Sequence, residues 1–210
     1  MNYYKLLVTI SMASIILPNI GGILAYRKLD IEGKKILLFF GVFMIVDFTI
    51  SWLANHNINN MPMFNIFSIL EYGFYAYLFY SNINNRNWRK GIYYSIWFFS
   101  AFTIFAVIFI RSIYEFNSEV RVVESLFLVF CSLLYFSQLS NTLIFERTKI
   151  FKIPMFWISI GVLFYFAGNF FLFLFFREIS QISPTIWSLH SVVNIITNSL
   201  FMISFLCRLK

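Results

Sequence analysis

The sequence predicts an all-α membrane protein in which residues 1–210 form a single domain of seven transmembrane helices. The composition is 60% hydrophobic and 22% aromatic, with 12% charged residues against roughly 25% in ordinary soluble domains. The apolar residues gather in seven runs of about 20 residues, the length that a helix needs to cross about 30 Å of hydrocarbon. The connections between the runs are too short for a further folded domain.

Each run predicts one helix. The first follows Lys5, and "LPNIGG" stands where a signal-peptide cleavage site would be needed, so we expect a retained helix. The asparagine-rich connections "HNINNM" and "SNINNRNWRK" have the composition of turns. In chain order, the predicted helices are residues 6–25, 36–55, 61–80, 91–112, 121–143, 153–176 and 185–206.

The distribution of Lys and Arg predicts the orientation, because loops rich in these residues stay in the cytoplasm. Twelve of the sixteen fall in the first, third and fifth connections and the C-terminal tail. This predicts an outside N-terminus and a cytoplasmic C-terminus in a cell membrane, and we favour a bacterial inner membrane. The other four are Lys5, Arg111, Arg121 and Arg177.

The net charge of +7 does not predict nucleic-acid binding, because the basic residues lie in short clusters and form no single patch. Cys131 and Cys207 lie far apart inside apolar segments, which is typical of buried hydrophobes. With two cysteines and two histidines, a structural zinc site lacks ligands. We therefore expect the lipid bilayer as a partner, and no metal or other cofactor.

Polar side chains inside the predicted helices recur at steps of four residues, which places them on one face. In "WSLHSVVNIITNSLF" these are His190, Asn194 and Asn198. Such residues usually face the interior of a helix bundle, because they are costly against lipid. We expect this face to meet polar faces of the second, third and sixth helices. The candidate ligand-binding residues are Asp47, Asn55, Glu71, Tyr72, Glu124, Asn169, His190 and Asn194.

Two interpretations of these residues stay open. In the first, their amide and imidazole groups hydrogen-bond between helices and only fasten the bundle. In the second, they line a cavity that opens to the outside, in which Glu71, Glu124 and His190 contact a small molecule, an ion or protons. Two carboxylates and a histidine in the predicted outer half favour the second interpretation.

Catalytic chemistry is not expected. The sequence contains no His-Glu-x-x-His motif, and no lysine lies in the last helix before Lys210, where a retinal protein would need one. Ser188 and Ser191 flank His190 on one helix, without a glycine nearby to form an oxyanion hole.

The segments "IFSILEYGFYAYLFY", "FWISIGVLFYFAGNFFLF" and "WSLHSVVNIITNSLF" resemble small stand-alone seven-helix membrane proteins of bacteria. More distantly, they resemble the seven-helix sensory modules of some histidine kinases. The resemblance implies a seven-helix fold and a sensory role, and assigns no functional residue. Because the sequence ends at "CRLK" without a kinase domain, a sensory output would have to pass through another protein.

The favoured prediction is a receptor-like or sensory protein that binds a small ligand from outside and signals through a membrane protein partner. A small-solute transporter made of two three-helix halves is the first alternative, with weak support from the sequence for an internal repeat. A membrane scaffold or assembly subunit, in which the abundant phenylalanine is helix-contact surface, is the second.

Overall fold

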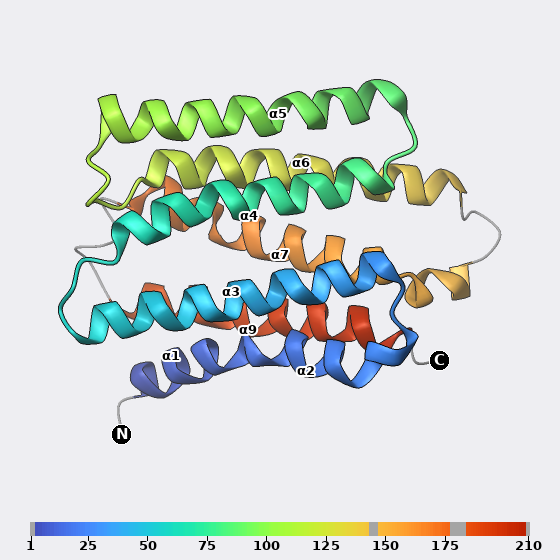
Figure 1. The fold of residues 1–210 in the computed structure, drawn as a ribbon, viewed down its shortest axis with the longest axis horizontal. Helices are drawn as coiled ribbons and strands as arrows, with labels where there is room; N and C mark the ends of the chain where they lie inside the picture. Colours follow the sequence, from blue (N-terminus) through green and yellow to red (C-terminus); the bar gives the residue numbers. More distant parts are fainter. Residues whose placement is uncertain (1–2, 143–146, 177–183, 209–210) are drawn as a thin grey trace.

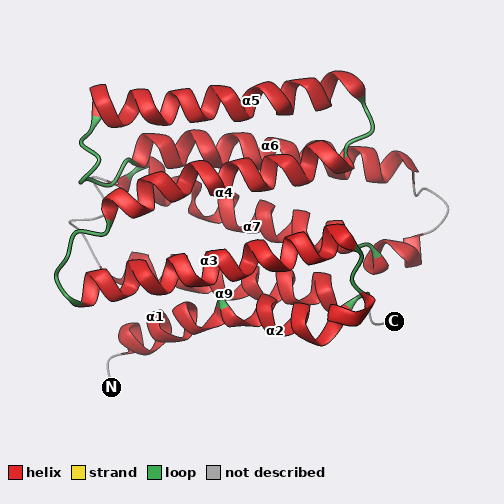
Figure 2. Ribbon diagram, in the orientation of Figure 1, coloured by secondary structure: helices red, strands yellow, loops and turns green. Residues whose placement is uncertain are grey.

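The computed structural model describes residues 3–142, 147–176 and 184–208. Helices account for nearly all of this part of the chain, and it contains no strand (Figure 2). The helices run lengthwise side by side, and the two ends of the chain lie at opposite ends of the bundle (Figure 1). The prediction of an all-α fold is confirmed.

The first predicted helix is divided in two. Helix α1 spans Tyr3–Ser14 and α2 spans Ile16–Ala25, followed by a 3₁₀ turn at Tyr26–Lys28. The break lies four residues before Pro18, whose ring lacks an N–H group and crowds the carbonyl four positions earlier. That carbonyl belongs to Ser14, the last residue of α1.

Two helices begin five residues before the apolar runs that predicted them. Helix α3 spans Ile31–Asn55 and α5 spans Arg86–Phe105. The Asp30 side chain accepts a hydrogen bond from the N–H of Gly33, and the Asn85 side chain accepts from the next residues of α5. Such caps satisfy the free N–H groups of a first turn, so charged residues beyond the apolar run become helical.

The remaining elements match the predicted runs more closely. A π-helical turn at Ala106–Ile110 extends α5, and a 3₁₀ turn at Arg147–Lys152 precedes α7. The other helices are α4 (Met61–Asn82), α6 (Ser118–Thr142), α7 (Pro154–Leu174) and α9 (Pro184–Leu206).

The helices pack in two groups with α7 between them. Helices α4, α5 and α6 lie together at the top of Figure 1, and α1, α2, α3 and α9 lie together at the bottom. Helix α7 packs against both α6 and α9, whereas the backbones of α3 and α4 approach each other at few positions and the two helices meet mainly through aromatic side chains. The last helix therefore packs beside the first.

Six helical segments among the described residues are long and apolar enough to cross a membrane: Lys5–Lys28, Ile31–Asn55, Arg86–Ile110, Ser118–Asn141, Pro154–Leu174 and Ser188–Leu206. Helix α4 is long enough, with 22 residues, but Asn65, Ser68 and Glu71 lower its hydropathy. These three side chains are buried inside the bundle. The structure thus supports a multi-pass membrane protein.

Candidate functional site

A buried ion cluster joins α4 to α6. One guanidinium nitrogen of Arg121 lies 2.7 Å from a carboxylate oxygen of Glu71 and 2.7 Å from one of Glu124. The Arg121 side chain is 5% exposed, and that of Glu124 is fully buried. The guanidinium also lies over the Phe64 ring, 4.1 Å from its centre. Arginine suits such a site because its planar head donates to several acceptors at once.

The position of Arg121 differs from the one expected from the sequence. The sequence counts Arg121 among the cations of the outer side, as the first residue of the predicted helix 121–143. In the structure it lies in the first turn of α6, and its guanidinium pairs with Glu71 inside the bundle. The reason is electrostatic, because a carboxylate buried without a partner is far costlier than one with a partner. The second oxygen of Glu124 remains buried without a hydrogen bond.

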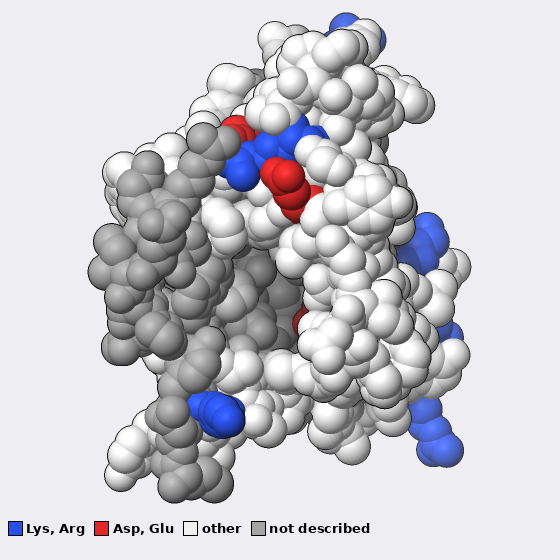
Figure 3. Space-filling view, turned by 90° about the vertical axis from the view of Figure 1, so that its left-hand side faces the viewer, with Lys and Arg blue, Asp and Glu red and all other residues white. Residues whose placement is uncertain are grey.

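A cavity begins beside this cluster. It offers about 80 Å³ to the centres of water-sized molecules, which is room for several waters or a small ligand. Figure 3 looks at the end of the bundle where α3 ends and α4 begins, and shows a hollow near the centre of that face. Residues of five helices and of the α1–α2 break line the cavity: Ile15, Phe40, Phe43, Asp47, Ile50, Phe64, Phe67, Glu71, Tyr75, Arg121, Tyr165, Asn194, Thr197, Asn198 and Phe201.

Three polar groups of the lining have no hydrogen-bond partner among the described residues. They are the carboxylate of Asp47 and the hydroxyl groups of Tyr75 and Tyr165, contributed by α3, α4 and α7. Buried polar groups that lack a protein partner generally bind ordered water or a ligand. These groups can therefore bind a molecule in the cavity without first giving up a contact within the protein.

The polar face of α9 contacts α1. The amide of Asn194 donates to the Ser11 hydroxyl at 3.1 Å, and that of Asn198 donates to the Ser14 hydroxyl at 2.8 Å. The expectation from the sequence named the second, third and sixth helices as neighbours of this face and did not include the first. Hydrogen bonds of this kind fasten helices together, so Asn194 both holds α1 and lines the cavity.

Aromatic rings close the cavity on the side away from the hollow. The ring of Phe201 lies 4.9 Å from that of Phe40 and 6.1 Å from that of Tyr75, measured between centres. Phe40 and Phe43 also pack edge to face. These side chains are buried and together form the aromatic floor of the cavity: Phe40, Phe43, Tyr75, Phe201 and Phe205.

The structure brings four of the predicted site residues to one region. Asp47, Glu71 and Asn194 line the cavity, and Glu124 is tied to it through Arg121. Two of these carboxylates contact the Arg121 guanidinium and the third, that of Asp47, lines the same cavity, so acidic groups outnumber basic ones here. Their field favours a positively charged occupant.

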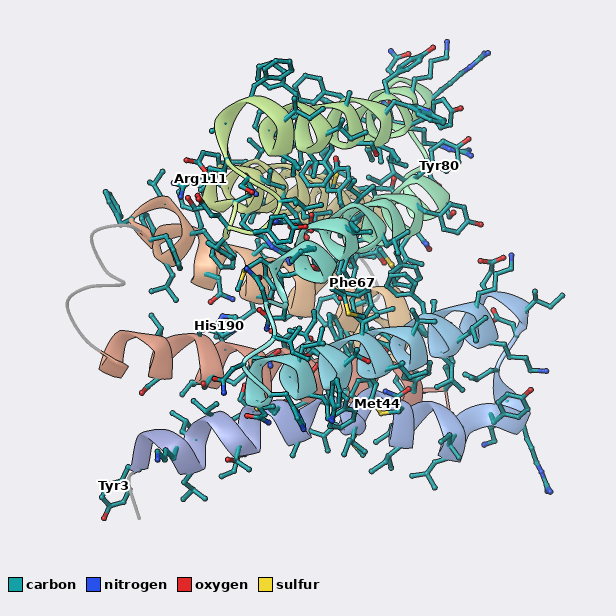
Figure 4. All side chains as sticks on the ribbon, turned by 60° about the vertical axis from the view of Figure 1, so that its left-hand side comes forward. Tyr3, Met44, Phe67, Tyr80, Arg111 and His190 are labelled. Atoms are coloured by element: carbon teal, nitrogen blue, oxygen red, sulfur yellow. The ribbon has the colours of Figure 1, made fainter. Side chains whose placement is uncertain are left out.

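The other four predicted site residues are not in the cavity lining. The imidazole Nδ1 of His190 lies 2.9 Å from the amide oxygen of Asn169, toward the same end of the bundle as Arg111 (Figure 4). Tyr72 donates a hydrogen bond to Ser95 on α5 at 2.7 Å. Asn55, the last residue of α3, is exposed.

Two residues that shape the site, Arg121 and Tyr75, are not among the residues predicted from the sequence. Arg121 lies three positions before the predicted site residue Glu124, a spacing that places both on one helix face and could have indicated a buried pair. Tyr75 also lines the cavity, and its ring lies 6.1 Å from that of Phe201 on α9. Spacing along one helix does not give such a contact between helices.

Among residues 3–142, 147–176 and 184–208, no three His, Cys, Asp or Glu side chains are arranged to hold a metal ion. Comparison of the chain with protein-family models, curated proteins and solved structures gives no match. The candidate site is therefore interpreted from its own geometry.

Proposed function

We propose that the chain is a receptor-like protein of the cell membrane with seven spans, an outside N-terminus and a cytoplasmic C-terminus. It binds a small, positively charged ligand in the cavity beside Arg121 and signals through a membrane protein partner. The single observation that carries the proposal is a cavity with unpartnered polar groups, enclosed by helices and closed on one side by the aromatic floor.

The inclusion of α4 as a span rests on its length and its surroundings. Its 22 residues extend roughly 33 Å, which matches the hydrocarbon thickness. It packs against α5 and α6, and its polar side chains Asn65, Ser68 and Glu71 are buried. Polar residues that face a bundle interior are compatible with a membrane helix.

The proposed orientation is compatible with the ion pairs that the Lys and Arg residues form. Of the four Lys and Arg residues predicted outside, Arg121 is buried in the ion cluster and Arg111 pairs with Glu119 at 2.9 Å. Lys5 is exposed, and Arg177 lies outside the described residues. Lys35 and Arg208 on the proposed cytoplasmic side are paired as well, so ion pairing does not remove the excess of Lys and Arg from that side.

The cavity suits a receptor better than a pore. The aromatic floor lies between the cavity and the opposite end of the bundle, so the polar lining does not continue through the protein. Binding and signalling require one opening only. The proposal agrees with the sequence's resemblance to sensory seven-helix modules.

Ligand binding can be coupled to helix movement because the cavity lies between the two helix groups. Asp47 belongs to the group of α1, α2, α3 and α9, and Tyr75 belongs to the group of α4, α5 and α6. A ligand that contacts both draws the groups together, and the few close approaches between the backbones of α3 and α4 leave the shift to be taken up by their aromatic side chains. A partner that touches both groups can sense this movement.

Thermal unfolding in detergent tests the proposal. A panel of small amines, amino acids and monovalent cations is added to the purified protein, and we expect at least one to raise the unfolding midpoint, because a ligand that binds only the folded state stabilises it. Asp47→Asn should remove the shift, whereas Asn55→Ala, on the same helix but outside the cavity, should retain it. An equal shift in wild type and Asp47→Asn would exclude this site.

Uptake into liposomes separates the receptor from the transporter alternative. A compound identified by the thermal screen should not accumulate inside protein-containing liposomes if the protein is a receptor. Accumulation that depends on Asp47 would favour a transporter. A stoichiometric membrane protein that co-purifies, together with no shift in the thermal screen, would instead favour a scaffold.

A further inference from the structure

A second pocket lies at the end of the bundle opposite the hollow, where α4 leads into α5. It offers about 480 Å³ to the centres of water-sized molecules and is open to the surroundings. In Figure 4, Tyr80 marks this end of α4, and side chains tipped with nitrogen extend from the helices beside it. Three basic and three tyrosine side chains line the pocket: Tyr80, Arg86, Arg89, Lys90, Tyr93 and Tyr94.

The cations of this pocket have no acidic partner among the described residues. No carboxylate lies in its lining, and none pairs with Arg86, Arg89 or Lys90. Two other cations at the same end of the bundle do have acidic partners. Lys35 pairs with Glu32, and Arg208 with Asp30. The pocket differs from these pairs in gathering three cations with no carboxylate in its lining.

The tyrosine rings give the pocket a defined wall. The guanidinium of Arg89 stacks on the Tyr80 ring, 4.6 Å from its centre. The rings of Tyr80 and Tyr93 lie 6.3 Å apart, and those of Tyr93 and Tyr94 lie 5.7 Å apart. Tyr94 is 66% exposed, so its ring extends outward from α5. Tyrosines in such positions are typical of the level of lipid headgroups.

The turn beneath the pocket is held in place by α6. The Gln138 side chain accepts a hydrogen bond from the N–H of Asn84 at 2.6 Å and donates one to the carbonyl of Asn82 at 3.0 Å. Ile83 between them is 3% exposed. The Asn85 side chain then caps the first turn of α5. The three cations are consequently presented by a fixed hairpin.

We propose that this pocket binds the phosphate group of an anionic phospholipid. Basic residues at the cytoplasmic edge of a membrane helix attract anionic headgroups, and arginine and lysine together recognise phosphate by charge and by hydrogen bonding. The exposed Tyr93 and Tyr94 provide surface for the glycerol and upper acyl region of the same lipid. The site lies at the other end of the bundle from the ligand cavity and does not depend on it.

A lipid titration of the full chain in detergent tests this proposal. The thermal midpoint is followed with short-chain phosphatidylglycerol, with phosphatidylcholine of the same chain length and with inorganic phosphate. We expect a saturable rise with phosphatidylglycerol alone. In Arg86→Gln/Lys90→Gln, the apparent affinity should fall roughly 30-fold, from the loss of two headgroup-attracting charges. The control Arg27→Gln/Lys152→Gln removes two exposed cations of the same end and should bind as the wild type does.

A second variant keeps the test decisive if the double variant is poorly folded. Arg89→Lys retains the charge but lacks the planar head that stacks on Tyr80, so binding should weaken several-fold. Equal responses to the two lipids, or wild-type affinity in both pocket variants, would overturn the site. An equal loss of lipid affinity in the control variant would also overturn the site, because net charge alone would then explain the binding. A full response to inorganic phosphate alone would overturn the assignment to lipid and indicate a soluble phosphate compound.

Discussion

The two halves of the bundle differ in where their charged side chains lie. In the half that contains the hollow, Arg121 and two glutamates lie inside the protein, within hydrogen-bonding distance of one another. In the other half, the interior around Phe40 and Phe201 is aromatic, and the cations lie at the surface. Polar interior and basic surface thus occur at opposite ends of one small protein.

The difference indicates which half is built for packing and which for binding. An aromatic interior gains stability from burial and from ring contacts at little cost. A buried ion cluster carries a desolvation cost, and a protein in which apolar side chains of similar volume replace the cluster is often no less stable. The presence of the cluster beside a cavity, and not elsewhere in the described interior, is therefore better explained by a binding role than by stability.

The largest expected effect comes from breaking the cluster. Arg121→Met leaves Glu71 and Glu124 buried without their cation, which should lower the free energy of unfolding by about 3–5 kcal/mol. Denaturant unfolding in mild detergent measures this. Replacing the whole set, as Glu71→Gln/Arg121→Met/Glu124→Gln, should recover most of the loss. A single variant as stable as the wild type would show that the cluster is not formed.

An intermediate effect is expected in the aromatic half. A Cβ atom added at Gly161 would lie 2.6 Å from the ring of Phe201, which Phe40 and Tyr75 hold in place. Gly161→Ala should therefore lower the free energy of unfolding by about 1–3 kcal/mol. The same measurement as for Arg121 checks it.

Gly91 provides the matched control for this substitution. It lies in the interior of α5, and nothing lies within 4 Å of the position that its Cβ would occupy. Gly91→Ala should stabilise the protein by up to about 1 kcal/mol, because alanine favours the helix. Equal effects at the two glycines would contradict the close packing of α7 against the aromatic floor.

The sequence predicts the helices better than it predicts their neighbours. Runs of apolar residues marked the long helices of the described residues, since the length and composition needed to cross a bilayer are local properties. Hydropathy did not predict that α3 and α5 begin five residues before their apolar runs. Asp30 and Asn85 cap these helices, so that charged residues ahead of the runs become helical. Caps of this kind are visible in a sequence, but a search for apolar runs passes over them.

The candidate site could be predicted only in part, for a different reason. Steps of four residues identify a polar face but do not tell which helix it meets, and Asn194 and Asn198 reach Ser11 and Ser14 more than 180 positions away. Arg121 was expected outside because it stands near the end of an apolar run. Its inward position depends on Glu71, fifty residues earlier. Such partners are set by tertiary packing.

The smallest expected effect concerns a surface pair in the basic half. The N–H of Gly33 and, next, the guanidinium of Arg208 lower the pKa of the Asp30 carboxyl below its ordinary value of 3.8. Because the folded pKa is the lower one, the stabilisation is present above pH 3.8 and is lost as the pH falls through the folded value. The Asp30 side chain is 66% exposed, so solvent screening limits the contribution of the pair to stability to about 0.2–1 kcal/mol.

Asp30→Asn isolates this charge, because asparagine also caps a helix. At pH 7 the variant should be less stable than the wild type by that small amount, and the difference should shrink as the pH falls below 3.8. Paired unfolding curves from pH 7 to pH 3 measure it, and the titration of all other groups cancels between the two chains. A difference that stays constant to pH 3 would place its origin in the cap. The exposed charge would then contribute nothing, in contrast to the buried charge of Arg121.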